Sequence, residues 1–157
     1  MDKNLPTHCI CQSQKPFKKC CDRFLNAGQY PKTPEQLMRS RYSAYALGGY
    51  GEYLLATWLP AMAKNLSEQQ LSHKESEWAG LEILSKSQKG DDGEVEFKAY
   101  YRDLDGGETD GSEVDSSETD GNGNKALASV LHEKSVFKRI QGRWLYVGGE
   151  VSHSELS

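Results

Sequence analysis

Apolar and polar residues alternate with two different periods along the chain. Between residues 33 and 77 the apolar side chains recur every three or four positions, which is typical of amphipathic helices. From Trp78 onward they recur at every second position, which is typical of strands that bury one face. The chain is therefore expected to begin with helices and to end with an antiparallel sheet.

Three helices are expected in the first part. The segment 33–36, Thr-Pro-Glu-Gln, combines an N-cap, a proline at the first helical position and a capping-box glutamine, so a helix begins there and runs to about Leu47, before Gly48. Shorter helices are expected over 51–58 and, after a second capping box, over 67–77. The inner face of the first helix is predicted to contain Leu37, Met38, Tyr42, Tyr45 and Ala46.

The sequence pattern predicts four strands in the second part of the chain. A first strand carries Leu81 and Ile83, a turn follows at 90–93, and a second strand continues to Arg102. Two more strands, over about 127–140 and 143–148, are joined at Gln141-Gly142. Helices followed by a meander of long strands predict an α+β roll, in which a curved antiparallel sheet wraps around the first helices. The second strand alternates Val95, Phe97, Ala99 and Tyr101 with polar residues.

An acidic segment separates the two pairs of strands. Residues 103–125 are rich in Gly, Asp, Glu, Ser and Thr and have almost no apolar side chains to offset the entropy of ordering. The Asp-Leu-Asp-Gly run at 103–106 hints at calcium, but the rest of an EF-hand loop is missing. A mobile solvated loop is the favoured interpretation.

Length and charge limit the classes of function. The chain has 157 residues and a formal net charge of −4, which fits one compact domain with a small appended segment and argues against general nucleic-acid binding. No run approaches the roughly 18 apolar residues that cross a bilayer, so no membrane association is expected. No targeting signal is evident at the amino terminus, so a cytoplasmic location is expected.

All four cysteines lie in one short polar stretch as two close pairs, Cys9 with Cys11 and Cys20 with Cys21. Four thiolates around one zinc ion form a closed tetrahedral site, which stabilises a fold and leaves no position for catalysis. Two disulfides, a redox role and unrelated buried thiols are the alternatives. A reducing compartment argues against disulfides, and the clustering argues against unrelated core positions.

The local pattern suggests how both pairs meet. Cys9 and Cys11 point the same way in an extended turn, and a helix from Ser13 to near Gly28 would bring the second pair to the same ion. Basic side chains surround the cysteines and would offset the negative charge of a tetrathiolate site. They are Lys15, Lys18, Lys19 and Arg23.

The pattern Cys-x-Cys-x8-Cys-Cys resembles the SEC-C motif of the SecA translocation ATPase tail, with Gln12, Gln14 and Asp22 where glycine is common. The resemblance covers residues 1–28 and implies zinc as a structural cofactor. It also implies docking to a protein partner, an export chaperone or the ribosome, through exposed lysines beside the metal. The implied ligands are Cys9, Cys11, Cys20 and Cys21, and the implied docking residues are Lys15, Lys18 and Lys19.

A wider resemblance spans most of the chain. Separated blocks are similar to the bacterial YchJ family, which joins a SEC-C motif to a nuclear transport factor two-like, or cystatin-like, roll. The resemblance places that roll at 33–150, with the acidic segment as an insertion, and implies fold and metal but no reaction. The blocks are 37–46, 57–58, 78–81, 95–97, 133–137 and 142–147.

Rolls of this kind enclose a cavity between sheet and helices. Glu133 and Ser135 share a strand face with Phe137, so they are expected to point inward toward an arginine of the first helix. The pair could be a structural ion pair, a ligand anchor or an acid–base group, and the ion pair is the favoured interpretation. The polar residues expected at the cavity are Arg39, Arg41, Tyr45, Glu133 and Ser135.

Two functions remain open at this level. The favoured one is a non-enzymatic protein-interaction module that docks through the zinc knot. The alternative is a small-molecule binding protein or an enzyme that uses the cavity. A His132–Glu133 dyad is not expected, because neighbouring residues of a strand face opposite sides, and no phosphate loop or nucleophile motif is present.

Overall fold

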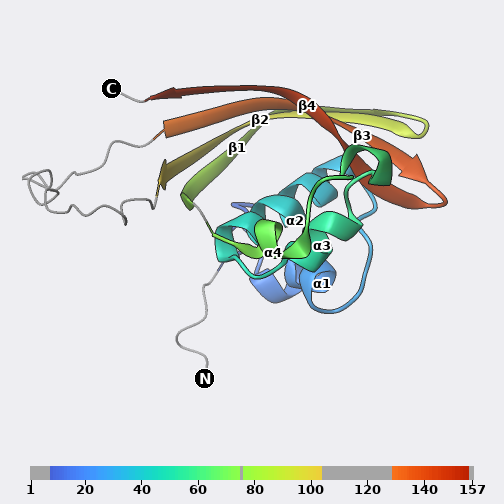
Figure 1. The fold of residues 1–157 in the computed structure, drawn as a ribbon, viewed down its shortest axis with the longest axis horizontal. Helices are drawn as coiled ribbons and strands as arrows, with labels where there is room; N and C mark the ends of the chain where they lie inside the picture. The colour runs from blue at the N-terminus through green and yellow to red at the C-terminus, as the bar shows by residue number, and fades with distance from the viewer. Residues whose placement is uncertain (1–7, 75, 104–128, 156–157) are drawn as a thin grey trace, which may run out of the picture.

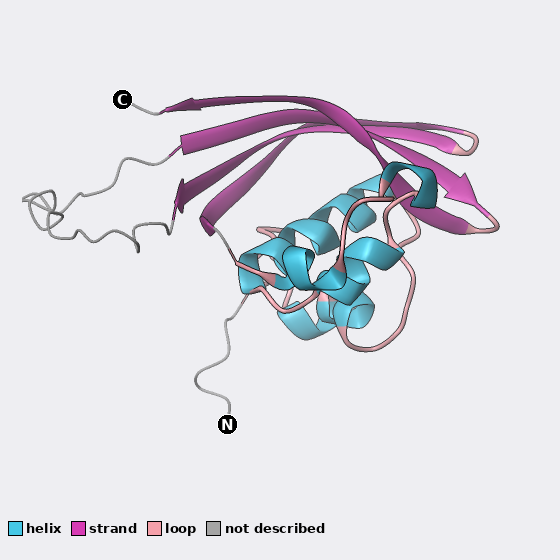
Figure 2. Ribbon diagram, in the orientation of Figure 1, coloured by secondary structure: helices cyan, strands magenta, loops and turns pink. Residues whose placement is uncertain are grey.

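The computed structural model describes residues 8–74, 76–103 and 129–155, and its helices lie together against one face of a four-stranded sheet (Figures 1 and 2). The strands follow in the order β1-β2-β3-β4, each antiparallel to its neighbour. The predicted α+β architecture with a curved antiparallel sheet is confirmed.

The longest helix is α2 (Pro34–Leu47), and its ends are those that the sequence predicts. The Thr33 side chain accepts a hydrogen bond from the Gln36 backbone N–H, and Gly48 ends the helix at a φ of 77°, which favours glycine. The other helical segments are η1 (Phe17–Lys19), α1 (Asp22–Leu25), α3 (Gly51–Ala56), η2 (Pro60–Met62) and α4 (Glu68–Ser72).

The shorter helices differ from the prediction. The helix expected from Ser13 to Gly28 is split into η1 and α1, because Cys20 between them has a non-helical backbone, with φ −127° and ψ −111°. That conformation turns the chain so that Cys20 joins the other cysteines. The helix expected over 67–77 ends at Ser72, and the following strand already begins at Ser76.

The strands are β1 (Ser76–Lys89), β2 (Asp92–Asp103), β3 (Ser129–Ile140) and β4 (Arg143–Glu155). In β2 the predicted alternation is confirmed, with Val95, Phe97 and Ala99 buried. Strand β4 continues beyond Gly148, where its end was predicted, because an irregular register at Val136/Phe137 lets it resume pairing with β3. The first hairpin turns at Gly90 and Asp91 alone rather than over four residues.

Helix α2 lies between the sheet and the cysteine-rich segment, and it joins both to one core. At its start the helix approaches β2 so closely that a Cβ atom on Gly93 would lie 2.4 Å from Pro34 Cγ. The core cluster contains the four cysteines as well as Leu37, Met38, Phe97 and Phe137. The amino-terminal segment is therefore part of the hydrophobic core rather than an appendage.

Two further expectations concern the acidic loop and the absence of a membrane-spanning segment. The predicted acidic loop at 103–125 lies outside the described residues, apart from Asp103 at the end of β2. Within the described ranges, no helix has the length and apolar character needed to cross a membrane.

Candidate metal centre and adjoining cavity

The four cysteine sulfur atoms lie within 4.8 Å of one another, and all four residues are buried. A tight turn positions the first pair, with the Cys9 N–H donating to the Lys15 carbonyl at 2.7 Å and the Gln12 N–H donating to the Cys9 carbonyl at 3.0 Å. Cys20 and Cys21 precede α1 and complete the cluster. Four convergent thiols at this spacing are compatible with one tetrahedral metal ion.

The turn depends on two residues in a left-handed conformation. Gln12 and Gln14 have φ values of 70° and 75°, a region that disfavours residues with a Cβ atom by about 1–2 kcal/mol. These are two of the positions where the SEC-C motif commonly has glycine. The chain thus keeps the turn geometry without the glycines. Asp22, the third such position, is simply the first residue of α1.

The thiols polarise one another. Hydrogen bonding to Cys21 lowers the pKa of Cys20 to about 6, and hydrogen bonding to Cys11 lowers the pKa of Cys9. Hydrogen bonding to Cys11 also raises the pKa of Cys21, so the four buried sulfurs do not lose their protons independently. Ser13 adds a hydroxyl contact to Cys20 Sγ at 3.1 Å. The cluster therefore favours thiolates at some positions, which are the form that binds metals.

Arg39 belongs to this cluster and not to the cavity, so its predicted place was wrong. Its Nη1 donates to the Cys11 carbonyl at 2.6 Å and lies 3.9 Å from Cys11 Sγ. Its Nε donates to Glu35 at 2.9 Å, and Lys86 bonds to the same carboxylate at 2.7 Å. The guanidinium is thus fixed as a positive neighbour of the cysteines. The predicted docking residues Lys15, Lys18 and Lys19 are exposed beside the cluster.

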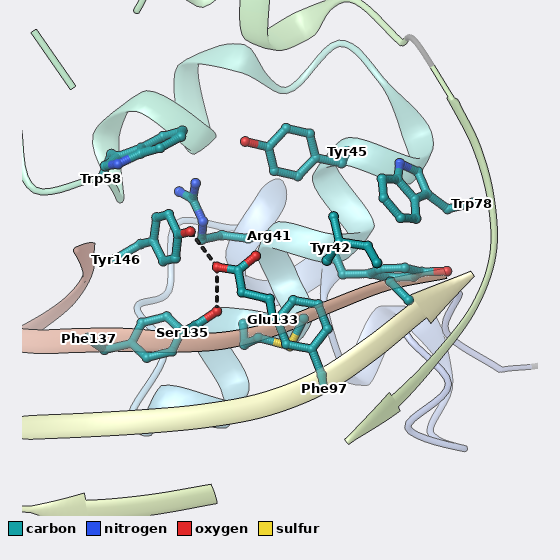
Figure 3. A pocket seen from close by; sticks show the side chains of 13 residues that line it. Arg41, Tyr42, Tyr45, Trp58, Trp78, Phe97, Glu133, Ser135, Phe137 and Tyr146 are labelled. Carbon is teal, nitrogen blue, oxygen red and sulfur yellow. Dashed lines mark hydrogen bonds between the residues drawn. The ribbon is translucent and has the colours of Figure 1, made fainter. Parts of the chain in front are cut away.

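A cavity of about 260 Å³ lies between α2 and the sheet (Figure 3). Aromatic side chains form most of its wall. The polar residues Arg41, Tyr45, Glu133 and Ser135 line it as predicted. The remaining lining residues are Met38, Tyr42, Trp58, Trp78, Phe97, Ala99, Leu131, Phe137 and Tyr146.

Glu133 is a buried carboxylate held by two hydroxyl groups of the sheet. Its Oε2 accepts hydrogen bonds from Ser135 Oγ at 2.8 Å and from Tyr146 Oη at 2.5 Å (Figure 3). Burial and the negative Glu133 carboxylate raise the pKa of Tyr146, so this hydroxyl remains a donor. A Cβ atom on Gly149 would lie 2.8 Å from the same carboxylate oxygen, so the neighbouring strand leaves it little room.

Arg41 is a buried cation held by the carboxyl-terminal end of α3. Its Nη1 donates to the Leu54 carbonyl at 2.8 Å and to Thr57 Oγ1 at 2.7 Å. Its guanidinium carbon lies 4.7 Å from the centre of the Trp58 ring and 4.6 Å from that of Tyr146. Burial lowers the pKa of Arg41, but an arginine stays charged even so.

The predicted ion pair between helix and sheet is not formed. Among the described residues, no salt bridge joins Arg41 to Glu133, because Arg41 is drawn to the α3 carbonyl and Glu133 to the hydroxyls of β3 and β4. His132 faces away from Glu133, as predicted, and pairs with Glu96 at 2.7 Å. Sequence reasoning missed Tyr146 as a partner of Glu133, although the alternation in β4 places it on the inner face.

Comparisons with known proteins agree with this geometry. Residues 33–149 match the family model for the YchJ middle NTF2-like domain. The chain is 34% identical to a UPF0225 protein of Serratia proteamaculans over 149 residues, covering 92% of this chain and 84% of the relative. The chain belongs to the YchJ family. A UPF0225 relative from Streptomyces coelicolor is 33% identical over 145 residues, covering 90% of this chain and 94% of the relative.

Two solved structures resemble the whole arrangement. The solution structure of a SEC-C motif containing protein from Rhodopseudomonas palustris has a TM-score of 0.71 and 31% identity, covering 91% of this YchJ-family chain and 97% of that one. The crystal structure of a SEC-C motif containing protein from Psychrobacter arcticus has a TM-score of 0.66 and 27% identity, with coverage of 92% and 82%. The resemblance to the YchJ family and the SEC-C motif, made from sequence, is confirmed.

The contact between Arg39 and Cys11 predicts an effect of Arg39 on metal release. We expect Arg39→Met to speed the release of the bound metal ion to a chromogenic chelator by about tenfold, since neighbours that orient and neutralise metal ligands typically contribute that much. Lys18→Met removes the same charge from an exposed side chain and serves as the control. Equal release rates for the two variants would show that Arg39 does not act on the metal centre.

Proposed function

We propose that this protein binds a small molecule in the cavity beneath α2 and that a structural zinc ion in the cysteine cluster holds that helix in place. The observation that carries the proposal is a buried arginine and a buried carboxylate that line one aromatic cavity without pairing with each other. Buried charges left without a charged partner are destabilising, so they are typical of binding sites rather than of cores.

Zinc is the ion that fits the cluster best. Four buried cysteine sulfurs give a soft, closed donor set with no carboxylate or water position, which favours zinc over calcium or magnesium. Such an ion contributes folding energy and supplies no reaction chemistry of its own. We expect native mass spectrometry to find one zinc per chain, and a protein that folds fully without any bound metal would contradict this role.

The two sites lie on different faces of one helix, about 100° apart around its axis. Arg39 and Ser43 contact the cysteine cluster, the latter with its Oγ 3.8 Å from Cys9 Sγ. Met38, Tyr42 and Tyr45 line the cavity. This division supports a zinc centre that acts on the cavity by fixing the position of α2.

A binding role accounts for the cavity better than catalysis does. The Glu133 carboxylate already accepts from Ser135 and Tyr146, and burial raises the pKa of Tyr146, so this hydroxyl is not prepared to give up its proton near neutral pH. The carboxylate and the hydroxyl instead offer hydrogen-bonding groups in fixed positions. Such groups orient a ligand.

Tryptophan side chains allow a direct test. Trp58 and Trp78 line the cavity, whereas Trp144 is buried elsewhere, with its Nε1 donating to the Lys32 carbonyl at 3.3 Å. We expect small aromatic compounds from a mixed-charge panel to shift the indole N–H resonances of Trp58 and Trp78 in an NMR titration and to leave that of Trp144 unmoved. A panel in which no compound moves either resonance would contradict a ligand-binding cavity.

Docking through the zinc knot is a second candidate function. It is supported by the exposure of Lys15, Lys18 and Lys19 beside the cluster and by the similarity of the chain to solved SEC-C motif containing proteins. Exposed lysines of this kind attract acidic partners such as an export chaperone or the ribosome. Docking uses a different surface from the cavity, so one protein can have both functions.

The docking hypothesis predicts a loss by charge reversal. We expect Lys18→Glu with Lys19→Glu to abolish cosedimentation with ribosomes or capture by a purified export chaperone, without a change in melting temperature, because both side chains are exposed. Lys89→Glu with Lys134→Glu makes the same change in charge at exposed positions of the sheet. If both double variants bind the partner as the unchanged protein does, the lysines do not dock it.

A further inference from the structure

The cavity has a polar end and an apolar end, and the ligand must suit both. Arg41, Glu133 and Tyr146 meet at one end, and Trp78, Tyr42 and Phe97 lie toward the other (Figure 3). The polar end combines one positive and one negative side chain, so their charges cancel for a group placed between them. A ligand with a net charge would be attracted by one side chain and repelled by the other.

Arg41 offers hydrogen-bond donors to this end. A guanidinium has five N–H groups, and the chain uses those of Nη1, through Leu54 and Thr57. Within the described parts of the chain, no hydrogen bond of the structure uses its Nε or Nη2, and the Tyr45 hydroxyl is the protein group that interacts with the guanidinium from the side of the cavity. Because the residue is 5% exposed, these donors are turned to the cavity rather than to bulk solvent. A ligand at the polar end must therefore carry an acceptor.

Glu133 offers the complementary acceptor. Both hydroxyl groups that reach the carboxylate donate to Oε2, from Ser135 and from Tyr146. Among the described residues, no hydrogen bond of the structure ends on Oε1. An ionised carboxylate oxygen readily accepts a hydrogen bond from an N–H group. The ligand must therefore carry a donor as well, close to the acceptor that faces Arg41.

The walls limit the shape of the ligand. Trp58, Tyr45, Trp78 and Phe97 present ring surfaces to a volume of about 260 Å³, which lies below the usual range for drug-sized ligands. Ring surfaces of this kind pack best against another flat ring. One or two fused rings fill such a space.

On the basis of the proposed binding function, we propose that the cavity takes a small, neutral aromatic compound with an amide edge, in which a carbonyl lies beside an N–H group. The carbonyl accepts from the Arg41 guanidinium, and the N–H donates to Glu133 Oε1. The ring packs among the aromatic side chains of the apolar end. Aromatic carboxamides, lactams and nucleobases share this edge.

Three compounds with the same ring separate the ligand classes: neutral benzamide, anionic benzoate and cationic benzylammonium. We expect benzamide to bind at least about tenfold more tightly than either ion, because each ion leaves one buried charge without a partner. The readout is the dissociation constant from the indole N–H shifts of Trp58 and Trp78, with Trp144 as the internal control. Tighter binding of benzoate or benzylammonium would overturn the amide assignment while leaving the binding function intact.

Glu133→Gln tests the same inference by a switch in preference. The substitution keeps the size of the side chain but removes the negative charge, so Arg41 is left unbalanced, and benzoate is expected to become the tightest of the three compounds. Glu150→Gln makes the same change in charge at an exposed position of β4 and should leave the order unchanged. An unchanged order in Glu133→Gln would contradict the charge balance. If no compound moves either resonance in the unchanged protein, both the binding function and the amide assignment fail.

Discussion

The packing of α2 between the cysteine cluster and the sheet is the contact on which the rest of the structure depends. One face of the helix contacts the cluster through Arg39 and Ser43, and a second face, about 100° around the helix axis, covers the cavity through Met38 and Tyr42. The four cysteines belong to the same core as Leu37 and Phe97, so the cysteine-rich segment packs as part of the domain. The cluster and the cavity are therefore joined by a single helix.

This arrangement also explains how two opposite charges are kept in an aromatic interior. Arg41 is compensated by a backbone carbonyl, a hydroxyl and two ring faces, and Glu133 by two hydroxyl groups. Neither set of contacts uses the other charge, so the two side chains are held apart by separate elements. Their positions are thus prepared in advance, which reduces the free energy needed to order them around a ligand.

Much of the fold follows from local chemistry in the sequence. The Thr33 cap and Gly48 define α2, and the alternation in β2 identifies its buried face. The roles of the two arginines were harder to separate, because residues 39 and 41 lie about 200° apart around a helix and nothing local shows which side meets the cysteines. The split at Cys20 was missed for a similar reason, since convergence of four sulfurs overrides local helix propensity.

The proposed function requires a metal ion in the cysteine cluster to maintain the cavity between α2 and the sheet. The most direct measurement follows the indole N–H resonances of Trp58, Trp78 and Trp144 while a chelator removes the metal and zinc is then returned. We expect the two cavity resonances to lose their native positions on chelation and to regain them with zinc. Unchanged cavity resonances in a protein shown to be free of metal would mean that the cluster and the cavity are independent.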